Sequence, residues 1–271
     1  MNQHSSLNRF FTRGVRLAAA LLSGALMMTT EQSAFAADAG TTGVHNIVLV
    51  HGAWADGSSW AKLIPLLQAK GFHVVAVQNP LNSLADDTAT TKRAIALMDG
   101  PVLLVGHSYG GAVITEAGAD PKVAGLVYVA AFAPDEGEVV GELGKEFPPP
   151  PGVGELRPDA AGYLSITPKG IEEDFAPDLS PAERKVMIAT QGPTNGACFG
   201  TKITNPAWRS KPTWYVIASN DRMIPPDLER KFAKAMNAKT LTLPSSHVPM
   251  LSHPEEVARF VAEAAATVTT K

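Results

Sequence analysis

Residues 101–118 read PVLLVGHSYGGAVITEAG, and this stretch decides the fold of the chain. It opens with four apolar residues, 102–105, in the pattern of a short buried strand, and it ends in a segment of helical pattern. Between them, residues 106–110 match the G-x-S-x-G motif, in which a serine stands on a strained strand-to-helix turn. Glycine on both sides of Ser108 removes side chains that would collide with the neighbouring helix and strand. A plain glycine-rich turn is the alternative, but the position between strand and helix favours Ser108 as a nucleophile.

Segments of strand pattern and helix pattern alternate along much of the chain. The predicted strands are short and largely apolar, and they cover residues 46–50, 72–77, 102–105, 123–130, 214–219 and 240–243. The predicted helices cover residues 60–70, 88–98, the segment after Gly111 to about 119, 228–236 and 254–266. Nearly continuous apolar strands separated by helices indicate an α/β fold, with a mostly parallel central sheet and helices on both faces.

Residues 134–208 interrupt this alternation. They contain four consecutive prolines, 148–151, scattered glycines, and only short helical stretches such as 181–190. We therefore predict a small inserted cap that lies over the sheet.

A serine hydroxyl needs a base to take its proton, and two histidines follow Ser108 in the chain. His247 follows the last predicted strand in a loop, from which a side chain reaches back over the edge of the sheet. His253 precedes Pro254, where a helix is expected to begin. The loop position favours His247 as the base.

The carboxylate that orients this histidine should leave the end of the preceding strand. Asp221 directly follows the predicted strand 214–219, whereas Asp227 follows two prolines and is expected to cap the next helix. Asp221 is therefore the predicted acid.

An oxyanion hole requires backbone N–H groups directed at the developing negative charge. We expect one from Tyr109, directly after the nucleophile, and one from Ala53, in the loop after the first strand. A His-Gly pair at 51–52 fits a plain turn as well, but together with the motif at 106–110 it supports a single site.

The chain resembles the α/β-hydrolase superfamily over nearly all of residues 37–271. More closely, it is similar to bacterial esterases related to the plant methylesterase and hydroxynitrile lyase group. Four segments carry the resemblance: VLVHGAWADGSSWAKLIPLL (48–67), PVLLVGHSYGGAVITEAG (101–118), WYVIASNDRMIPP (214–226) and SSHVPMLSHPEEVARFV (245–261). It implies a triad of Ser108, Asp221 and His247, oxyanion N–H groups from Ala53 and Tyr109, and a cap before the strand at 214.

Two departures from that group bear on the reaction. Its lyases carry a threonine after the histidine of the first loop and a lysine after the catalytic histidine, whereas this chain has Gly52 and Val248 there. Without that hydroxyl and that ammonium group, lyase chemistry lacks its special groups. The resemblance therefore implies ester hydrolysis.

The substrate pocket is less determined by the sequence. The candidates are Trp54, His107, Phe175 and Trp208, although packing of the cap onto the sheet is the ordinary role of such residues. We expect a small to medium, largely hydrophobic carboxylic ester. A lactonase or a cofactor-free perhydrolase with the same triad is one alternative, and a ligand-binding, receptor-like protein with vestigial hydrolase activity is another.

Composition narrows the remaining classes. The 271-residue chain has a net charge of −3 and no long run of Lys or Arg, so we expect a small-molecule partner and no nucleic acid. Cys198 is the only cysteine, which excludes an intrachain disulfide and a thiolate-rich metal site. No cofactor motif was found, and no metal or cofactor is expected. The sequence gives no indication of oligomeric state.

The first 36 residues have the pattern of an export signal. Arg9, Arg13 and Arg16 precede an uncharged stretch at 17–30, and Ala34-Phe35-Ala36 resembles a cleavage site. The stretch is too short for a spanning helix. We expect cleavage after Ala36, a periplasmic or secreted protein of residues 37–271, and no stable membrane anchor after cleavage.

Overall fold

The computed structural model describes residues 43–268. The predicted export signal and its cleavage site lie outside the described residues. Within residues 43–268, none of the helices has the length and apolar character that crossing a membrane requires.

The core is a six-stranded sheet with the strand order β2-β1-β3-β4-β8-β9, in which every neighbouring pair is parallel. Its strands are β1 (Asn46–Val50), β2 (His73–Ala76), β3 (Val102–Ser108), β4 (Val123–Ala131), β8 (Thr213–Ala218) and β9 (Lys239–Leu243). Every residue of β1 and β3 is buried. The predicted parallel α/β sheet is confirmed, and each predicted strand coincides with an observed one.

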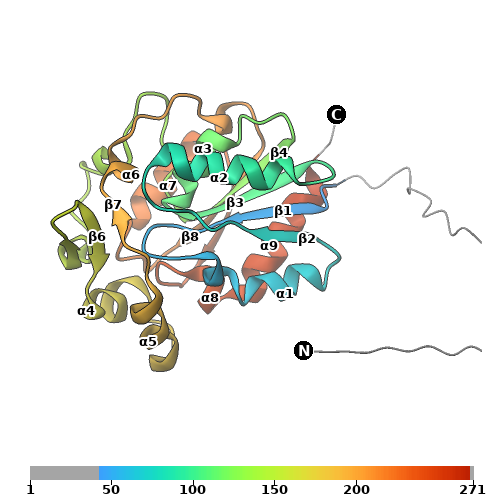
Figure 1. The fold of residues 1–271 in the computed structure, drawn as a ribbon. Coiled ribbons are helices and arrows are strands. Elements are labelled where there is room, and N and C mark those ends of the chain that lie inside the picture. Colours follow the sequence, from blue (N-terminus) through green and yellow to red (C-terminus); the bar gives the residue numbers. More distant parts are fainter. Residues whose placement is uncertain (1–42, 269–271) are drawn as a thin grey trace, which may run out of the picture. The chain divides into compact units, whose positions relative to one another are not determined.

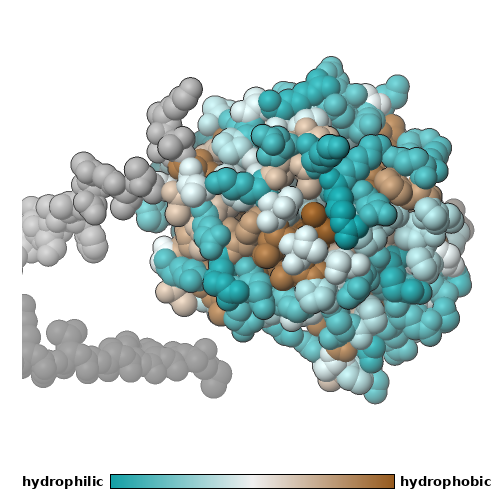
Figure 2. Space-filling view, turned by 180° about the vertical axis from the view of Figure 1, so that it is seen from behind, coloured by the Kyte–Doolittle hydropathy of each residue, from teal (hydrophilic) through white to brown (hydrophobic). Residues whose placement is uncertain are grey.

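Helices cover both faces of this sheet (Figure 1). On one face lie α2 (Leu84–Ala96), α3 (Gly110–Ala117) and α7 (Pro226–Ala235), and on the other lie α1 (Leu63–Gln68) and α9 (Pro254–Thr267). The short α8 (Pro249–Ser252) precedes α9. Seen from behind, the described surface is mostly hydrophilic, with apolar side chains gathered near its middle (Figure 2).

The start of α2 differs from the sequence prediction by four residues. The helix begins at Leu84, not at 88, because the Ser83 side chain accepts a hydrogen bond from the backbone N–H of Asp86 and caps it. This early start places Asp87 inside the first turn, on the buried side of the helix.

The cap, residues 134–208, contains more than short helices. A three-stranded antiparallel sheet joins β5 (Leu156–Pro158), β6 (Tyr163–Ile166) and β7 (Thr194–Asn195). Around it stand α4 (Pro168–Gly170), α5 (Pro181–Thr190) and α6 (Ala197–Gly200). The prediction of helical pieces alone was wrong here, because strands of two to four residues are too short to show an alternating pattern. The cap lies beyond the carboxyl ends of the core strands (Figure 1).

Candidate active site

Ser108 is the last residue of β3 and has a φ of 53°, a left-handed conformation that costs energy for a residue with a side chain. The two flanking glycines make this turn possible. A Cβ atom at Gly106 would lie 2.6 Å from the carbonyl oxygen of Gly110, and one at Gly110 would lie 2.5 Å from that of Val50. Since both obstacles are backbone atoms, no side chain fits at either position. The turn therefore projects the Ser108 side chain beyond the end of the strand.

His247 and Asp221 meet Ser108 at this edge of the sheet. The Nε2 atom of His247 lies 2.8 Å from the Ser108 Oγ, and its Nδ1 lies 2.6 Å from an Asp221 carboxylate oxygen. The other Asp221 oxygen accepts the backbone N–H groups of Met223 and Ile224 at 2.7 and 2.9 Å. All three predicted residues are buried and form one continuous hydrogen-bonded chain.

His253 and Asp227, the alternatives for the base and the acid, lie away from Ser108. His253 stands at the N-terminus of α9, with its Nδ1 3.9 Å from Glu256, as expected for a residue at a helix start. Asp227 lies in the first turn of α7, one residue after the start and not at the cap, and it pairs with Arg230 at 2.6 Å.

The N–H groups predicted for the oxyanion hole have no acceptor within residues 43–268. Among the hydrogen bonds of residues 43–268, none uses the backbone N–H of Ala53 or Tyr109. A Cβ atom at Gly52 would lie 2.7 Å from the Cβ of Ser108, so the first loop passes directly beside Ser108. The structure thus brings both donors' loops to Ser108.

Asp87 holds the side chain of Tyr109 and was not predicted from sequence. It is fully buried, accepts the Tyr109 hydroxyl at 2.8 Å and accepts the backbone N–H of Leu81 at 2.9 Å. Burial raises the pKa of the Asp87 carboxyl, and these hydrogen bonds partly offset that rise. The sequence signal that could have indicated Asp87 is the N-cap at Ser83, because a helix that begins after Ser83 places Asp87 on its buried face.

Two of the four pocket candidates support His247 from behind. His107 is fully buried, and its Nε2 lies 2.7 Å from the carbonyl oxygen of His247. Burial, and then the nearby His247, hold the pKa of His107 well below its usual range, so His107 is neutral and donates to that carbonyl. The Phe175 ring meets His247 edge-on, with centroids 5.0 Å apart. Both residues contact His247, and neither is among the residues that line the cavity at Ser108.

A third candidate, Trp208, also proved wrong as a pocket residue. Its indole N–H donates to the carbonyl of Pro134 at 3.0 Å and so fastens the two ends of the cap together. Trp54, the fourth candidate, lines the cavity. It has a φ of 57°, donates its indole N–H to Leu164 in β6 at 2.9 Å, and stacks on Phe199.

The cavity at Ser108 and His247 has a volume of about 240 Å³ and is enclosed mainly by apolar side chains. Most of them have no signal in the sequence, since they come from the residue after β4, from separate parts of the cap and from the segment 223–228 that leads into α7. Besides Ser108, His247 and Trp54, it is lined by Phe132, Val140, Gly141, Leu143, Gly144, Pro150, Val153, Leu156, Leu164, Phe199, Met223, Ile224, Pro225 and Leu228.

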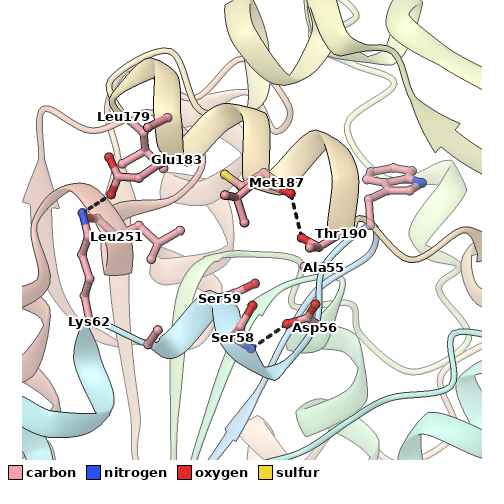
Figure 3. Close-up of a pocket in the computed structure, with 14 residues that line it drawn as sticks. Ala55, Asp56, Ser58, Ser59, Lys62, Leu179, Glu183, Met187, Thr190 and Leu251 are labelled. Carbon is pink, nitrogen blue, oxygen red and sulfur yellow. Dashed lines mark hydrogen bonds and ion pairs between the residues drawn. The ribbon is translucent and has the colours of Figure 1, made fainter.

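A larger groove of about 420 Å³ lies between α5 and the segment 55–62 that follows β1 (Figure 3). Side chains of α5, such as Met187 and Thr190, face Ser58 and Ser59 of the first loop across it. An ion pair between Lys62 and Glu183, 2.5 Å apart, spans one end. The groove contains neither Ser108 nor His247 among its lining residues, and Trp54 lines both this groove and the cavity at Ser108.

One segment of the cap is fastened to the loops that carry His247 and Asp221. Asp174 pairs with Arg222, beside Asp221, at 2.6 Å, and Asp178 accepts the backbone N–H of Ser246, beside His247, at 2.8 Å. Residues 174–178 are therefore part of the support of the site. Within the described residues, no cluster of three or more His, Cys, Asp or Glu side chains is arranged to hold a metal ion.

Comparison with known proteins agrees with this geometry. A pyrethroid hydrolase from Sphingobium wenxiniae is 27% identical, over 81% of this chain and 87% of that protein. Methylesterase 1 of Arabidopsis thaliana is 26% identical, over 79% of this chain and 94% of that protein. The crystal structure of a pyrethroid hydrolase from Sphingobium faniae superposes with a TM-score of 0.69 at 26% identity, covering 83% of this chain and 98% of the other.

An α-hydroxynitrile lyase of Arabidopsis thaliana is similar as well, at 29% identity over 79% of this chain and 94% of that protein. The model of the alpha/beta hydrolase family matches residues 47–260, which is most of the chain. The resemblance expected from sequence is thereby confirmed, and the protein belongs to the α/β hydrolase family, with esterase-type relatives.

Proposed function

We propose that this protein is a serine esterase that cleaves small to medium, largely hydrophobic carboxylic esters through an acyl-enzyme on Ser108. The observation that carries the proposal is the unbroken hydrogen-bonded chain from Ser108 through His247 to Asp221, at the wall of an apolar cavity. Nucleophile, base and orienting acid in this order are what acyl transfer requires.

In the proposed mechanism, Nε2 of His247 removes the Ser108 proton as Oγ attacks the ester carbonyl carbon. The N–H groups of Ala53 and Tyr109 hold the resulting oxyanion, and the Asp221 carboxylate stabilises the imidazolium. The alcohol leaves with the proton from His247. Water then attacks the acyl-enzyme by the same route, which releases the acid and restores Ser108.

The residues beside the site support hydrolysis over lyase chemistry. Val248, which follows His247, is fully buried and offers no charged group to the cavity. Gly52 lies too close to Ser108 for any side chain to stand there. The names of the relatives, a hydrolase and methylesterases among them, also favour an ester substrate.

The size and lining of the cavity support a short or medium acyl group. Its walls are apolar, and its volume of about 240 Å³ leaves little room for a long chain. We expect hydrolysis of p-nitrophenyl acetate and butyrate, and a marked decline with the octanoate.

The test compares these three esters with wild-type protein and Ser108→Ala. We expect the activity of Ser108→Ala to fall by at least about 10⁴-fold, since the acyl-enzyme can no longer form. Absence of turnover by folded wild-type protein on all three esters, or turnover that survives in Ser108→Ala, would contradict the proposal.

A further inference from the structure

Glu229 is a second carboxyl group buried behind the catalytic acid. It lies on α7 and is 0% exposed, although glutamate is almost never fully buried unless it is paired. One carboxyl oxygen, Oε2, accepts the backbone N–H of Ala218, the last residue of β8, at 2.9 Å. The other, Oε1, is enclosed and receives no N–H or O–H from the described residues.

Asp221 is the acidic neighbour of Glu229 through Ala218: the Ala218 N–H donates to Glu229, and the Ala218 carbonyl accepts the backbone N–H of Asp221. Two buried carboxylates side by side cannot both be ionised, because their charges repel in a poorly solvated place. One of the two carboxyl groups must therefore be protonated. Burial first, and then the charge of Asp221, raise the pKa of Glu229 well above its usual range.

The hydrogen bonds decide which carboxyl carries the proton. Asp221 accepts two backbone N–H groups and the Nδ1–H of His247, all of which favour its ionised form. Glu229 accepts a single N–H, which leaves Oε1 as the atom that carries a hydrogen. The geometry points to a neutral Glu229 that donates its O–H to the Asp221 carboxylate and thereby acts as a positioning residue for the triad.

The proposed contact would hold Asp221 from the side opposite His247 and would disperse part of its charge. Without this donor the Asp221 carboxylate would present more of its charge to the imidazolium of His247 that forms in the reaction. Glu229 never touches substrate, so its effect reaches the reaction only through Asp221 and His247.

Few other ionisable groups lie around Glu229, Asp221 and His247. Glu229 faces Tyr215 of β8, whose pKa burial raises well above its usual range, and Arg230 follows it on α7. His247 faces Asp221 and the neutral His107, and Asp178 is bonded to the adjacent Ser246. In the part of the chain that the structure describes, Tyr215 bonds to Ala131 and Arg230 to Asp227, and neither donates to the Glu229 carboxyl.

The experiment compares two substitutions of matched length, Glu229→Gln and Glu229→Met. Gln keeps a donor for Asp221 and an acceptor for Ala218, whereas Met keeps neither. The readout is the pH profile of kcat/KM for p-nitrophenyl butyrate. We expect the acidic limb of Glu229→Gln to stay within about 0.2 pH units of wild type. We expect that of Glu229→Met to move up by about 0.5 pH units, with kcat about fivefold lower. Thermal unfolding and titration of Ser108 with an organophosphate ester show that each variant is folded.

Two outcomes would overturn the inference. A shift of the acidic limb to lower pH in Glu229→Gln would mean that an ionised carboxylate had been removed. Equal profiles and equal kcat for Glu229→Gln and Glu229→Met would mean that the contact does not position Asp221.

This inference rests on the proposed function for its kinetic readout, so a second measurement needs no turnover. Infrared difference spectra of wild type and Glu229→Gln at neutral pH should show a protonated carboxyl band in wild type only. Absence of this band would contradict a neutral Glu229. This measurement does not depend on whether Glu229→Met folds. If the band is present but no ester is hydrolysed, the esterase proposal fails while the neutral Glu229 stands.

Discussion

The carboxyl edge of the core sheet and the outer part of the cap hold their polar groups in opposite ways. At the sheet edge, Ser108, His247 and Asp221 are buried and bonded to specified atoms. In the outer cap, α5 has no buried residue, and the ion pair between Lys62 and Glu183 is partly exposed. Exposed ion pairs contribute little to stability, whereas a buried hydrogen-bonded chain fixes geometry. The comparison teaches that specific buried hydrogen bonds hold Ser108, His247 and Asp221, whereas the outer cap is held by exposed contacts.

The inner segment of the cap, residues 174–178, belongs with the sheet edge in this respect. Phe175 packs on His247, while Asp174 and Asp178 bond to the loops of Asp221 and His247. The boundary between the buried, hydrogen-bonded part of the molecule and its exposed part therefore runs through the cap itself. The following substitutions test where this boundary lies.

The largest effect is expected at His247. His247→Ala removes the base, so ester turnover should fall by about 10⁴-fold or more, while His253→Ala, at the start of α9, should change kcat/KM less than twofold. Steady-state kinetics with p-nitrophenyl acetate measures both. If the two substitutions had similar effects, the triad assignment would be wrong.

The second prediction compares two apolar residues of the cap. Phe175→Ala should lower the free energy of unfolding by about 3–5 kcal/mol, because it opens a hole behind His247 in a buried place. Val186→Ala, at a side chain that is 60% exposed on α5, should change it by less than about 0.5 kcal/mol. Urea denaturation gives both values. Comparable losses would show that the outer cap is as tightly packed as the inner segment.

The third prediction concerns the link between Asp178 and Ser246. Asp178→Ala removes the acceptor of the Ser246 N–H, and the loop that carries His247 loses a fixed point. We expect kcat to fall about tenfold with KM little changed, since positioning acts on the transition state more than on substrate binding. Asp227→Ala, an exposed acid on α7 that does not contact this loop, is the matched control. An unchanged kcat in Asp178→Ala would mean that residues 174–178 do not position His247 and belong with the outer cap.

The smallest effect is the pH dependence of stability due to Glu229. Because the folded pKa lies above the usual value of 4.5, the folded protein keeps a proton that the unfolded chain has lost. Its contribution to stability is therefore complete below pH 4.5 and declines as pH rises towards the folded pKa. Glu229→Gln removes this decline, so its Tm should exceed that of wild type by about 2–4 °C at pH 8 and by less at pH 5. A constant Tm difference across this pH range would contradict the assignment.

Local patterns in the sequence were sufficient for the elements whose signals are short in range. The strand 46–50 and the helix 181–190 were predicted at their observed bounds, because apolar runs, β-branched residues and caps act over a few neighbours. The structure also brings together Ser108, Asp221 and His247, which chain order and position at strand ends had suggested.

What the sequence did not reveal depends on contacts between distant residues. The cap sheet pairs β6 with β7 across a long stretch of chain, and its strands are too short to show a period. The same holds for side-chain placement, since Phe175 and His107 turned out to lie behind His247 and Trp208 at the base of the cap.

The serine motif at 106–110, the strand-end and loop positions of Asp221 and His247, and the alternation of strands and helices can thus be read from the residues alone, because each is a local pattern. The walls of the cavity, the buried partners Asp87 and Glu229, and the attachment of residues 174–178 exist only once the chain has folded, because segments far apart in sequence must first be brought within hydrogen-bonding distance.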